Sequence, residues 1–161
     1  MNIPIKYLPK KLSIKDKNKL KRELKKSRKL YKKGKYHTRK KVKSFKSKKS
    51  NHVTNAENIY NIKSLKINKE LERKTGCTKK ALQKIMKKGQ GAYYSSGSRP
   101  NQTAHSWGYA RLASSITSGK SAAVDFKILK EGCKTNSKAL RLAKKARKKH
   151  GFGTRKVPKT S

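Results

Sequence analysis

The sequence has very few acidic residues. Of 161 residues, 7 are Asp or Glu and 48 are Lys or Arg, which gives a formal net charge of +41. So large an uncompensated charge repels itself and is typical of a chain that contacts a polyanion. Duplex DNA carries one negative charge per ~1.7 Å of axis, so the excess matches the phosphates on roughly 70 Å of helix. We therefore expect nucleic acid as the partner.

Long apolar runs are also lacking. Hydrophobic residues make up 32% of the chain, which is enough for one small core and excludes a large enzyme body. No run approaches the ~18 apolar residues of a membrane span. Pro4, Pro9 and several lysines interrupt the amino-terminal residues, unlike a secretory signal. We expect a protein of the cell interior that is neither secreted nor transmembrane, and no membrane partner.

Cysteine and histidine are scarce as well. Cys77 and Cys133 are the only two cysteines, and they lie far apart in the sequence. This usage fits reduced thiols in a small core better than a disulfide scaffold. The four histidines share no metal-ligand spacing with the cysteines. We therefore expect no metal site and no cofactor.

The charge is unevenly distributed along the chain. Residues 1–50 hold 22 Lys and Arg against 2 acids, and residues 138–161 hold 10 against none. The region between them has a composition closer to that of an ordinary globular domain. This distribution predicts a basic arm over 1–52, a small helical domain over 53–150 and a basic tail over 151–161.

Part of the arm has helical spacing. Leu20, Leu24, Ser27 and Tyr31 recur every three or four residues, which predicts a helix over 13–33. The rest of that helix surface is nearly all lysine, so phosphates would steady it. The run that follows, KYHTRKKVKSFKSKKSN, has no sustained period and few apolar residues. We expect it to be extended, and disordered when free.

A glycine turn separates two short helices in the domain. A helix over 69–75 is expected to end at Gly76, and Thr78 is expected to cap a second helix over 79–88 that stops at Gly89. Two short helices joined in this way are what a helix-turn-helix requires. An ordinary helical hairpin remains the alternative.

The spacing of apolar residues agrees with a helix-turn-helix. Leu71, Cys77, Leu82 and Ile85 would be buried in the angle between the two helices. Glu72 departs from the pattern, because many such motifs place a small residue there. The outward positions, expected to contact phosphates or base edges, are Lys79, Lys80, Gln83, Lys84 and Lys87.

The remaining elements are also expected to be helical. Glycines, serines and Pro100 predict a loop from Gly89 to Pro100, and Asn101 or Thr103 would cap a helix over 104–118. Two more helices are expected, one ending at Gly132 and one running from Ser137 to Gly151. The predicted fold class is therefore all-α.

One stretch of the sequence resembles a known family. KTGCTKKALQKIMKKGQGAYYSSGSRPNQTAHSWGYARLAS is similar to a family of small uncharacterised proteins of large eukaryotic double-stranded DNA viruses and tailed phages. The resemblance covers about 68–130 and implies a viral origin; the lysine-rich arm lies outside it and resembles basic proteins that some large viruses package with their genomes. The residues that carry it are Thr75-Gly76, Leu82, Gly89, Gly91-Ala92, Arg99-Pro100, Trp107 and Ala110-Arg111.

The signals for catalysis are weak. The segment SITSGKSA lacks the spacing of a phosphate-binding loop, because Ser114 stands where that motif requires glycine. The acids of the central region form no local pair suited to holding two metal ions or to acid–base work. We therefore expect a protein that is not an enzyme.

Arg99 is the strongest functional candidate outside the helix pair. Pro100 holds it in extended backbone, and the aromatic rings of 93–94 and Trp107 offer surfaces on which a base can stack. In the alternative interpretation, Trp107 centres a small core and Arg111 packs or pairs beside it. The further side chains expected to contact nucleic acid are Arg99, Arg111, Lys21, Arg22, Lys25, Arg39, Lys40 and Lys41.

These observations predict a virion-associated, nucleic-acid-binding protein that neutralises and organises packaged viral DNA, in the virion and in the host-cell factory or nucleus. Duplex DNA is favoured, and binding by counterion release would be weakly sequence-specific. A minor capsid protein that bridges capsid subunits, or capsid and genome, is one alternative. An RNA-binding, ribosomal-protein-like role is another, because basic tails penetrate folded RNA by the same electrostatics.

Overall fold

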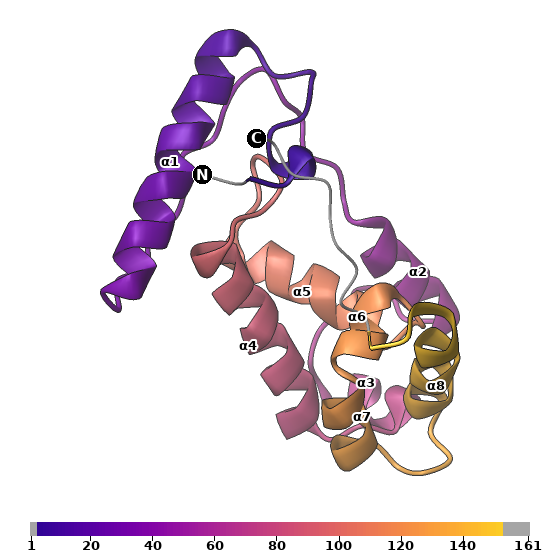
Figure 1. The fold of residues 1–161 in the computed structure, drawn as a ribbon. Helices are drawn as coiled ribbons and strands as arrows, with labels where there is room; N and C mark the ends of the chain where they lie inside the picture. The colour runs from indigo at the N-terminus through magenta and orange to yellow at the C-terminus, as the bar shows by residue number, and fades with distance from the viewer. Residues whose placement is uncertain (1–2, 153–161) are drawn as a thin grey trace. The chain divides into compact units, whose positions relative to one another are not determined.

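The computed structural model describes residues 3–152, and these residues fold into helices without a β-strand (Figure 1). The predicted all-α class is confirmed. None of the helices in this part of the chain is long and apolar enough to cross a membrane. The elements are η1 Ile5–Tyr7, α1 Ile14–Lys32, α2 Asn51–Ile59, α3 Lys69–Thr75, α4 Lys79–Ser95, α5 Ala104–Ser115, α6 Lys120–Val124, α7 Phe126–Gly132 and α8 Lys138–His150.

The chain divides into two compact units, and each has its own apolar core. Unit 1 comprises residues 3–48 and 90–107, and unit 2 comprises residues 49–89 and 108–152. Helices α4 and α5 each contribute residues to both units. This division differs from the expected arm, domain and tail, because the loop between α4 and α5 groups with the amino-terminal residues. All but two residues of the expected tail lie outside the described residues.

The core of unit 1 is built mainly from the lysine-rich amino-terminal residues. Tyr7, Leu20, Leu24 and Val42 are buried there, and Trp107 packs against them. The region expected to be a basic arm therefore supplies its own apolar side chains to a core. Charge dominates its composition, but a few apolar residues at helical spacing suffice to fold it.

Helix α1 begins and runs where the sequence predicts. The Ser13 hydroxyl accepts a hydrogen bond from the Asp16 N–H and so caps the first turn. Leu20, Leu24 and Ser27 are buried along one side, as their spacing predicts. The rest of the helix surface is formed mostly by lysine and arginine.

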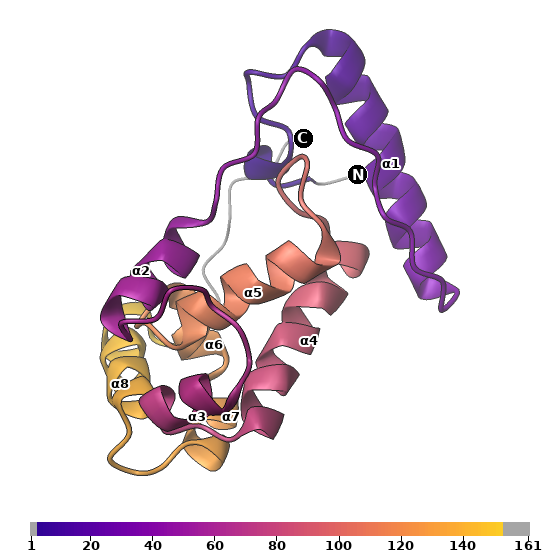
Figure 2. The ribbon, with the colours of Figure 1, turned by 180° about the vertical axis from the view of Figure 1, so that it is seen from behind.

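The segment after α1 is extended, but hydrogen bonds hold it in place. It returns alongside α1 (Figure 2). The Asp16 carboxylate accepts bonds from the Ser44 N–H and hydroxyl, and Glu23 accepts one from the Lys40 N–H. This order differs from the disorder expected for residues 35–51. The reason is that the two acids among residues 3–48 both bind this segment.

In unit 2, helices α3 and α4 form the predicted pair. Asn68 caps α3, whose bounds match the prediction, and Gly76 ends it in the left-handed conformation with φ of 77°. A side chain at Gly76 would stand 2.5 Å from the Ser137 Cβ, so glycine is required there. The Thr78 hydroxyl accepts from the Ala81 N–H and caps α4, as predicted. A helix-turn-helix and an ordinary hairpin share these features, so the choice between them stays a prediction.

The predicted end of α4 at Gly89 is wrong. The helix continues through Gly89 and Gly91 to Ser95, and the loop begins only after it. A glycine inside a helix costs about 1 kcal/mol, which tertiary packing readily offsets. Here the last turns of α4 carry Tyr93, whose side chain is fully buried.

The later helices agree with the prediction except for two differences: α5 ends at Ser115 rather than at residue 118, and one short helix is added. Thr103 rather than Asn101 caps α5, because its hydroxyl accepts from the Ser106 N–H. Helices α7 and α8 lie where expected, whereas the short α6 was not predicted. Helix α8 packs against α3, α6 and α7 in the core of unit 2 (Figure 1).

Candidate nucleic-acid interface

Helix α4 carries an exposed basic face. Its predicted inward residues, Leu82 and Ile85, are buried, as are Leu71 and Cys77 from the preceding helix and turn. Glu72, which departs from the motif pattern, accepts a hydrogen bond from the Lys79 N–H and so binds the amino terminus of α4. All five residues predicted to face outward are exposed: Lys79, Lys80, Gln83, Lys84 and Lys87.

A second basic face lies on α8 and is absent from the predicted contacts. Leu140, Ala143 and Ala146 are buried on the inner side of this helix. The same helical period places lysines and arginines on the outer side, so the signal was available in the sequence. The exposed cations of α8 are Arg141, Lys144, Lys145, Lys148 and Lys149.

In unit 1, the predicted contacts on α1 are exposed. Lys21, Arg22 and Lys25 all lie on the solvent side of the helix. Their positions follow from the burial of Leu20 and Leu24, because a helix that buries one stripe exposes the opposite one. These three side chains are therefore in a position to meet phosphates.

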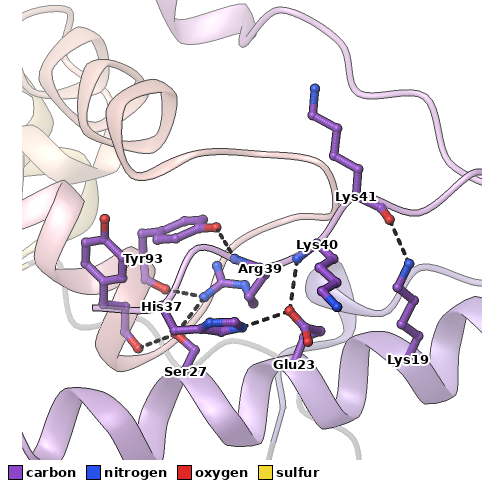
Figure 3. Close-up of polar contacts among 9 residues, drawn as sticks. Lys19, Glu23, Ser27, His37, Arg39, Lys40, Lys41 and Tyr93 are labelled. Atoms are coloured by element: carbon purple, nitrogen blue, oxygen red, sulfur yellow. Dashed lines mark hydrogen bonds and ion pairs between the residues drawn. The ribbon is translucent and has the colours of Figure 1, made fainter. Parts of the chain in front are cut away.

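Arg39 is buried, in contrast to the other predicted contacts from the amino-terminal region. Figure 3 shows its guanidinium between α1 and Tyr93. The guanidinium donates to the Tyr93 carbonyl (2.6 Å), the Ser27 hydroxyl (3.1 Å) and the Ser98 hydroxyl (2.8 Å). It also lies 3.8 Å from the centre of the Tyr93 ring. Arg39 therefore joins α1, the extended segment and the end of α4 within unit 1. These bonds occupy it in the fold of unit 1.

Lys40 and Lys41 follow Arg39 and leave their side chains exposed. Their backbones fix the segment, since the Lys40 N–H donates to Glu23 and the Lys41 carbonyl accepts from the Lys19 ammonium at 3.1 Å (Figure 3). Burial alone would raise the pKa of Glu23, but hydrogen bonds from the Lys40 N–H and His37 outweigh it and hold that pKa below its usual range.

Arg99 is exposed in the loop between α4 and α5. The structure brings it together with Arg39 and Lys40 around one small pocket of unit 1. The neighbouring Asn101 fixes the loop, because its side-chain amide exchanges hydrogen bonds with the Val42 backbone. Two distant parts of the sequence thus supply three of the predicted contacts to one place.

The aromatic rings near Arg99 are largely used within the fold. Tyr93 is fully buried beneath the Arg39 guanidinium and is closed to a base. The Tyr94 ring packs against Tyr36, with ring centres 5.0 Å apart. Trp107 is partly exposed and meets Tyr7 edge-on at 6.2 Å, at the border of the unit 1 core rather than at its centre.

Arg111 belongs to a buried ion network in unit 2. Its guanidinium donates twice to Asp125, at 3.0 and 2.8 Å, while Ser115 and Lys88 bind the same carboxylate. Burial alone would raise the pKa of Asp125, but Arg111, Ser115 and Lys88 together hold it below its usual range. This use agrees with the alternative in which Arg111 pairs within the domain, so we leave it out of the proposed interface.

The two cysteines form a disulfide, which corrects the expectation of reduced thiols. It joins the turn before α4 to the segment after α7. Two backbone hydrogen bonds flank it, from the Thr78 N–H to the Gly132 carbonyl and from the Lys134 N–H to the Gly76 carbonyl. Sequence spacing could not reveal this pairing, because 56 residues separate the two cysteines.

Most of the chain matches the model of a known protein family. A family model matches residues 4–141. The chain belongs to the family of unknown function DUF5824. The DUF5824 match includes the lysine-rich residues that the sequence resemblance leaves outside, so both units belong to the family. No curated protein and no solved structure matches the chain.

Proposed function

We propose that this DUF5824 protein binds nucleic acid without catalysing a reaction. Duplex DNA is the favoured partner, bound by the basic faces of α4 and α8 in unit 2 and of α1 in unit 1. The resemblance to viral families supports a more specific role, in which the protein is associated with the virion and neutralises and organises packaged DNA.

The observation that carries this proposal is how the carboxylates are used. Six of the seven acids accept hydrogen bonds or ion pairs; five of them do so within the fold, and Glu70 pairs with Lys74 at the surface. Among the described residues, Lys49, Lys74 and Lys88 each pair with an acid. The acids therefore neutralise few of the exposed lysines and arginines, and most of the positive excess of this part of the chain faces solvent. The six acids are Asp16, Glu23, Glu57, Glu70, Glu72 and Asp125.

Binding of this kind follows counterion release. Each phosphate neutralised by a lysine or arginine frees condensed cations. A plot of the logarithm of the binding constant against the logarithm of the salt concentration therefore becomes steeper by about 0.9 for each contact. Such contacts fix position on the duplex and read little sequence. We expect tight binding at low salt, weak sequence preference and a steep loss of affinity as salt rises.

A charge-matched pair of variants tests the proposal. The first replaces Lys80, Lys84 and Lys87 on the outer face of α4 with glutamine. The control replaces Lys63, Lys66 and Lys69 with glutamine; these residues are equally exposed but lie outside the proposed faces. Both variants lose three charges. Binding of each full-length chain to random-sequence duplex DNA is measured by fluorescence anisotropy over a range of salt concentrations.

In the α4 variant, we expect the slope of the logarithm of the binding constant against the logarithm of the salt concentration to become shallower by about 2 to 3, because up to three phosphate contacts disappear. In the control variant, the slope should change by less than about 1. Equal slopes for the two variants would contradict an interface on α4. A wild-type chain without affinity for duplex DNA would contradict the proposed partner. Competition with structured RNA at one ionic strength then shows whether RNA replaces DNA.

A further inference from the structure

The small pocket of unit 1 has the chemistry of an anion site. Arg39, Lys40 and Arg99 line it, together with the polar residues Ser98 and Gln102. Among the described residues, no Asp or Glu lines the pocket. Glu23 does not line the pocket, but its carboxylate accepts a hydrogen bond from the Lys40 N–H. Three cations against this one neighbouring carboxylate leave the recess with a positive excess, which attracts an anion.

The three cationic residues of the pocket come from two separate segments of unit 1, residues 39–40 and the loop before α5. Tyr7 also lines the pocket, and burial raises the pKa of this tyrosine. Arg39, Arg28 and Arg99 act against that increase, because each guanidinium stabilises the charged phenolate. Arg39 and Arg99 line the pocket together with Tyr7, whereas Arg28 does not line it.

The pocket is held ready for its ligand. Hydrogen bonds to Ser27, Tyr93 and Ser98 fix the guanidinium of Arg39, one of the residues that line the pocket. Arg99 precedes Pro100, which restricts its backbone to extended conformations. A site fixed in this way loses little side-chain entropy when it binds. Arg99 and Lys40 are exposed, so their heads are the ones that can close on an entering group.

We propose that a single phosphate group of nucleic acid sits at the mouth of this pocket, whose interior holds only about one water molecule, with Arg99 and Lys40 as its direct ligands and Arg39 as a fixed charge behind them. Arginine matches the phosphate oxygens with two parallel N–H groups, which favours phosphate over a spherical anion such as chloride. This inference rests on the proposed function for the source of the phosphate. The group is either an internal phosphate of the backbone or a terminal one.

The chain contains its own reporter for the test. Trp107 is the only tryptophan, and its ring packs against Tyr7, which lines the pocket. Inorganic phosphate is titrated into the full-length protein at constant ionic strength while Trp107 fluorescence is recorded. We expect a saturable change with phosphate that chloride does not reproduce.

Two variants and one control assign the signal. Arg99→Gln and Lys40→Gln remove exposed ligands, and each should weaken the phosphate response about ten-fold or more, the effect of losing a charge-assisted hydrogen bond. Arg73→Gln removes one exposed charge from unit 2 and should leave the response unchanged. A linear response, an equal response to chloride, or equal weakening by Arg73→Gln would overturn the proposal.

Oligonucleotides identify the source of the phosphate. One strand is compared with a 5′-phosphate and with a 5′-hydroxyl end. Tighter binding of the phosphorylated strand that Arg99→Gln abolishes assigns a terminal phosphate; equal binding that Arg99→Gln weakens assigns an internal one. Binding of both strands unaffected by Arg99→Gln would overturn the site.

The outcome for the pocket is separable from that for the proposed function. A saturable phosphate response in a chain without affinity for DNA keeps the pocket and removes the proposed function. DNA binding that depends on Lys80, Lys84 and Lys87, without a saturable phosphate response, keeps the function and removes the pocket.

Discussion

At the scale of single residues, the arginines divide into two groups that the sequence does not distinguish. Arg39 and Arg111 are bound inside the fold, whereas Arg22 and Arg99 are exposed. Composition assigns all of them to nucleic acid. Their roles depend on partners elsewhere in the chain. Tyr93 lies 54 residues after Arg39, so the sequence around Arg39 does not predict this contact.

Asp125 provides a residue-scale prediction about pH. A carboxyl group whose folded pKa is lowered contributes stability that is present above its unfolded pKa of about 3.9 and is lost as the pH falls through the folded pKa. Asp125→Asn should therefore cost about 2 kcal/mol at neutral pH, less than a fully buried pair because Arg111 and Lys88 retain some solvent. The difference from the wild type should shrink below about pH 4.

Urea unfolding followed by helical circular dichroism at several pH values measures this difference. Glu70→Gln is the control, because Glu70 forms only an exposed pair with Lys74 and should change stability little at any pH. A cost of Asp125→Asn that stays constant from neutral to acidic pH would show that its charge is not what stabilises unit 2.

At the scale of elements, helix starts were predictable because they are local. Ser13, Asn68, Thr78 and Ser137 each cap the helix that follows, and a cap needs only three neighbouring residues. Helix ends at glycine were less secure. Gly76 ends α3 because its backbone is left-handed, whereas the packing of later residues carries α4 through 89–91. Tertiary contacts decided that difference.

Two glycines of unit 1 provide a matched prediction. Gly91 lies inside α4, where an added Cβ would meet the Tyr31 hydroxyl at an ordinary 3.7 Å. Gly91→Ala should stabilise unit 1 by about 0.5–1 kcal/mol through helix propensity. Gly97 has φ of 132°, and an added Cβ would lie 2.8 Å from the Leu24 side chain. Gly97→Ala should destabilise unit 1 by more than about 1 kcal/mol.

Trp107 lies in unit 1, so its fluorescence during urea unfolding measures the stability change of unit 1 in each of the two variants. Loss of stability in Gly91→Ala would indicate that α4 does not continue through this position. An unchanged Gly97→Ala would indicate that the loop before Arg99 does not need its left-handed backbone.

At the scale of the whole molecule, two small apolar cores and one disulfide stabilise the fold against repulsion between its many positive charges. The disulfide closes a loop of 56 residues, and the chain-entropy argument assigns such a loop about 4 kcal/mol. The acids bind backbone N–H groups and the Arg111 network, and they are too few to neutralise the basic faces. The chain therefore folds while keeping the charge that the proposed function requires. The sequence predicted the charge and the helices, but not that residues 1–48 and 90–107 share a core.

The same charge predicts opposite effects of salt on folding and on binding. Raising NaCl from about 50 to about 500 mM shortens the screening length from about 14 Å to about 4 Å, which weakens repulsion between exposed cations. The melting temperature of the free protein should rise by about 3 °C or more, because relief of about 1 kcal/mol shifts a chain of this size by that amount. Affinity for duplex DNA should fall over the same range.

A calorimetric melting curve and the anisotropy titration measure the two effects on one preparation. The Lys80, Lys84 and Lys87 variant, with less charge to screen, should show a smaller rise. A melting temperature that falls with salt would mean that attractive ion pairs, and not repulsion, dominate the electrostatics of the free chain.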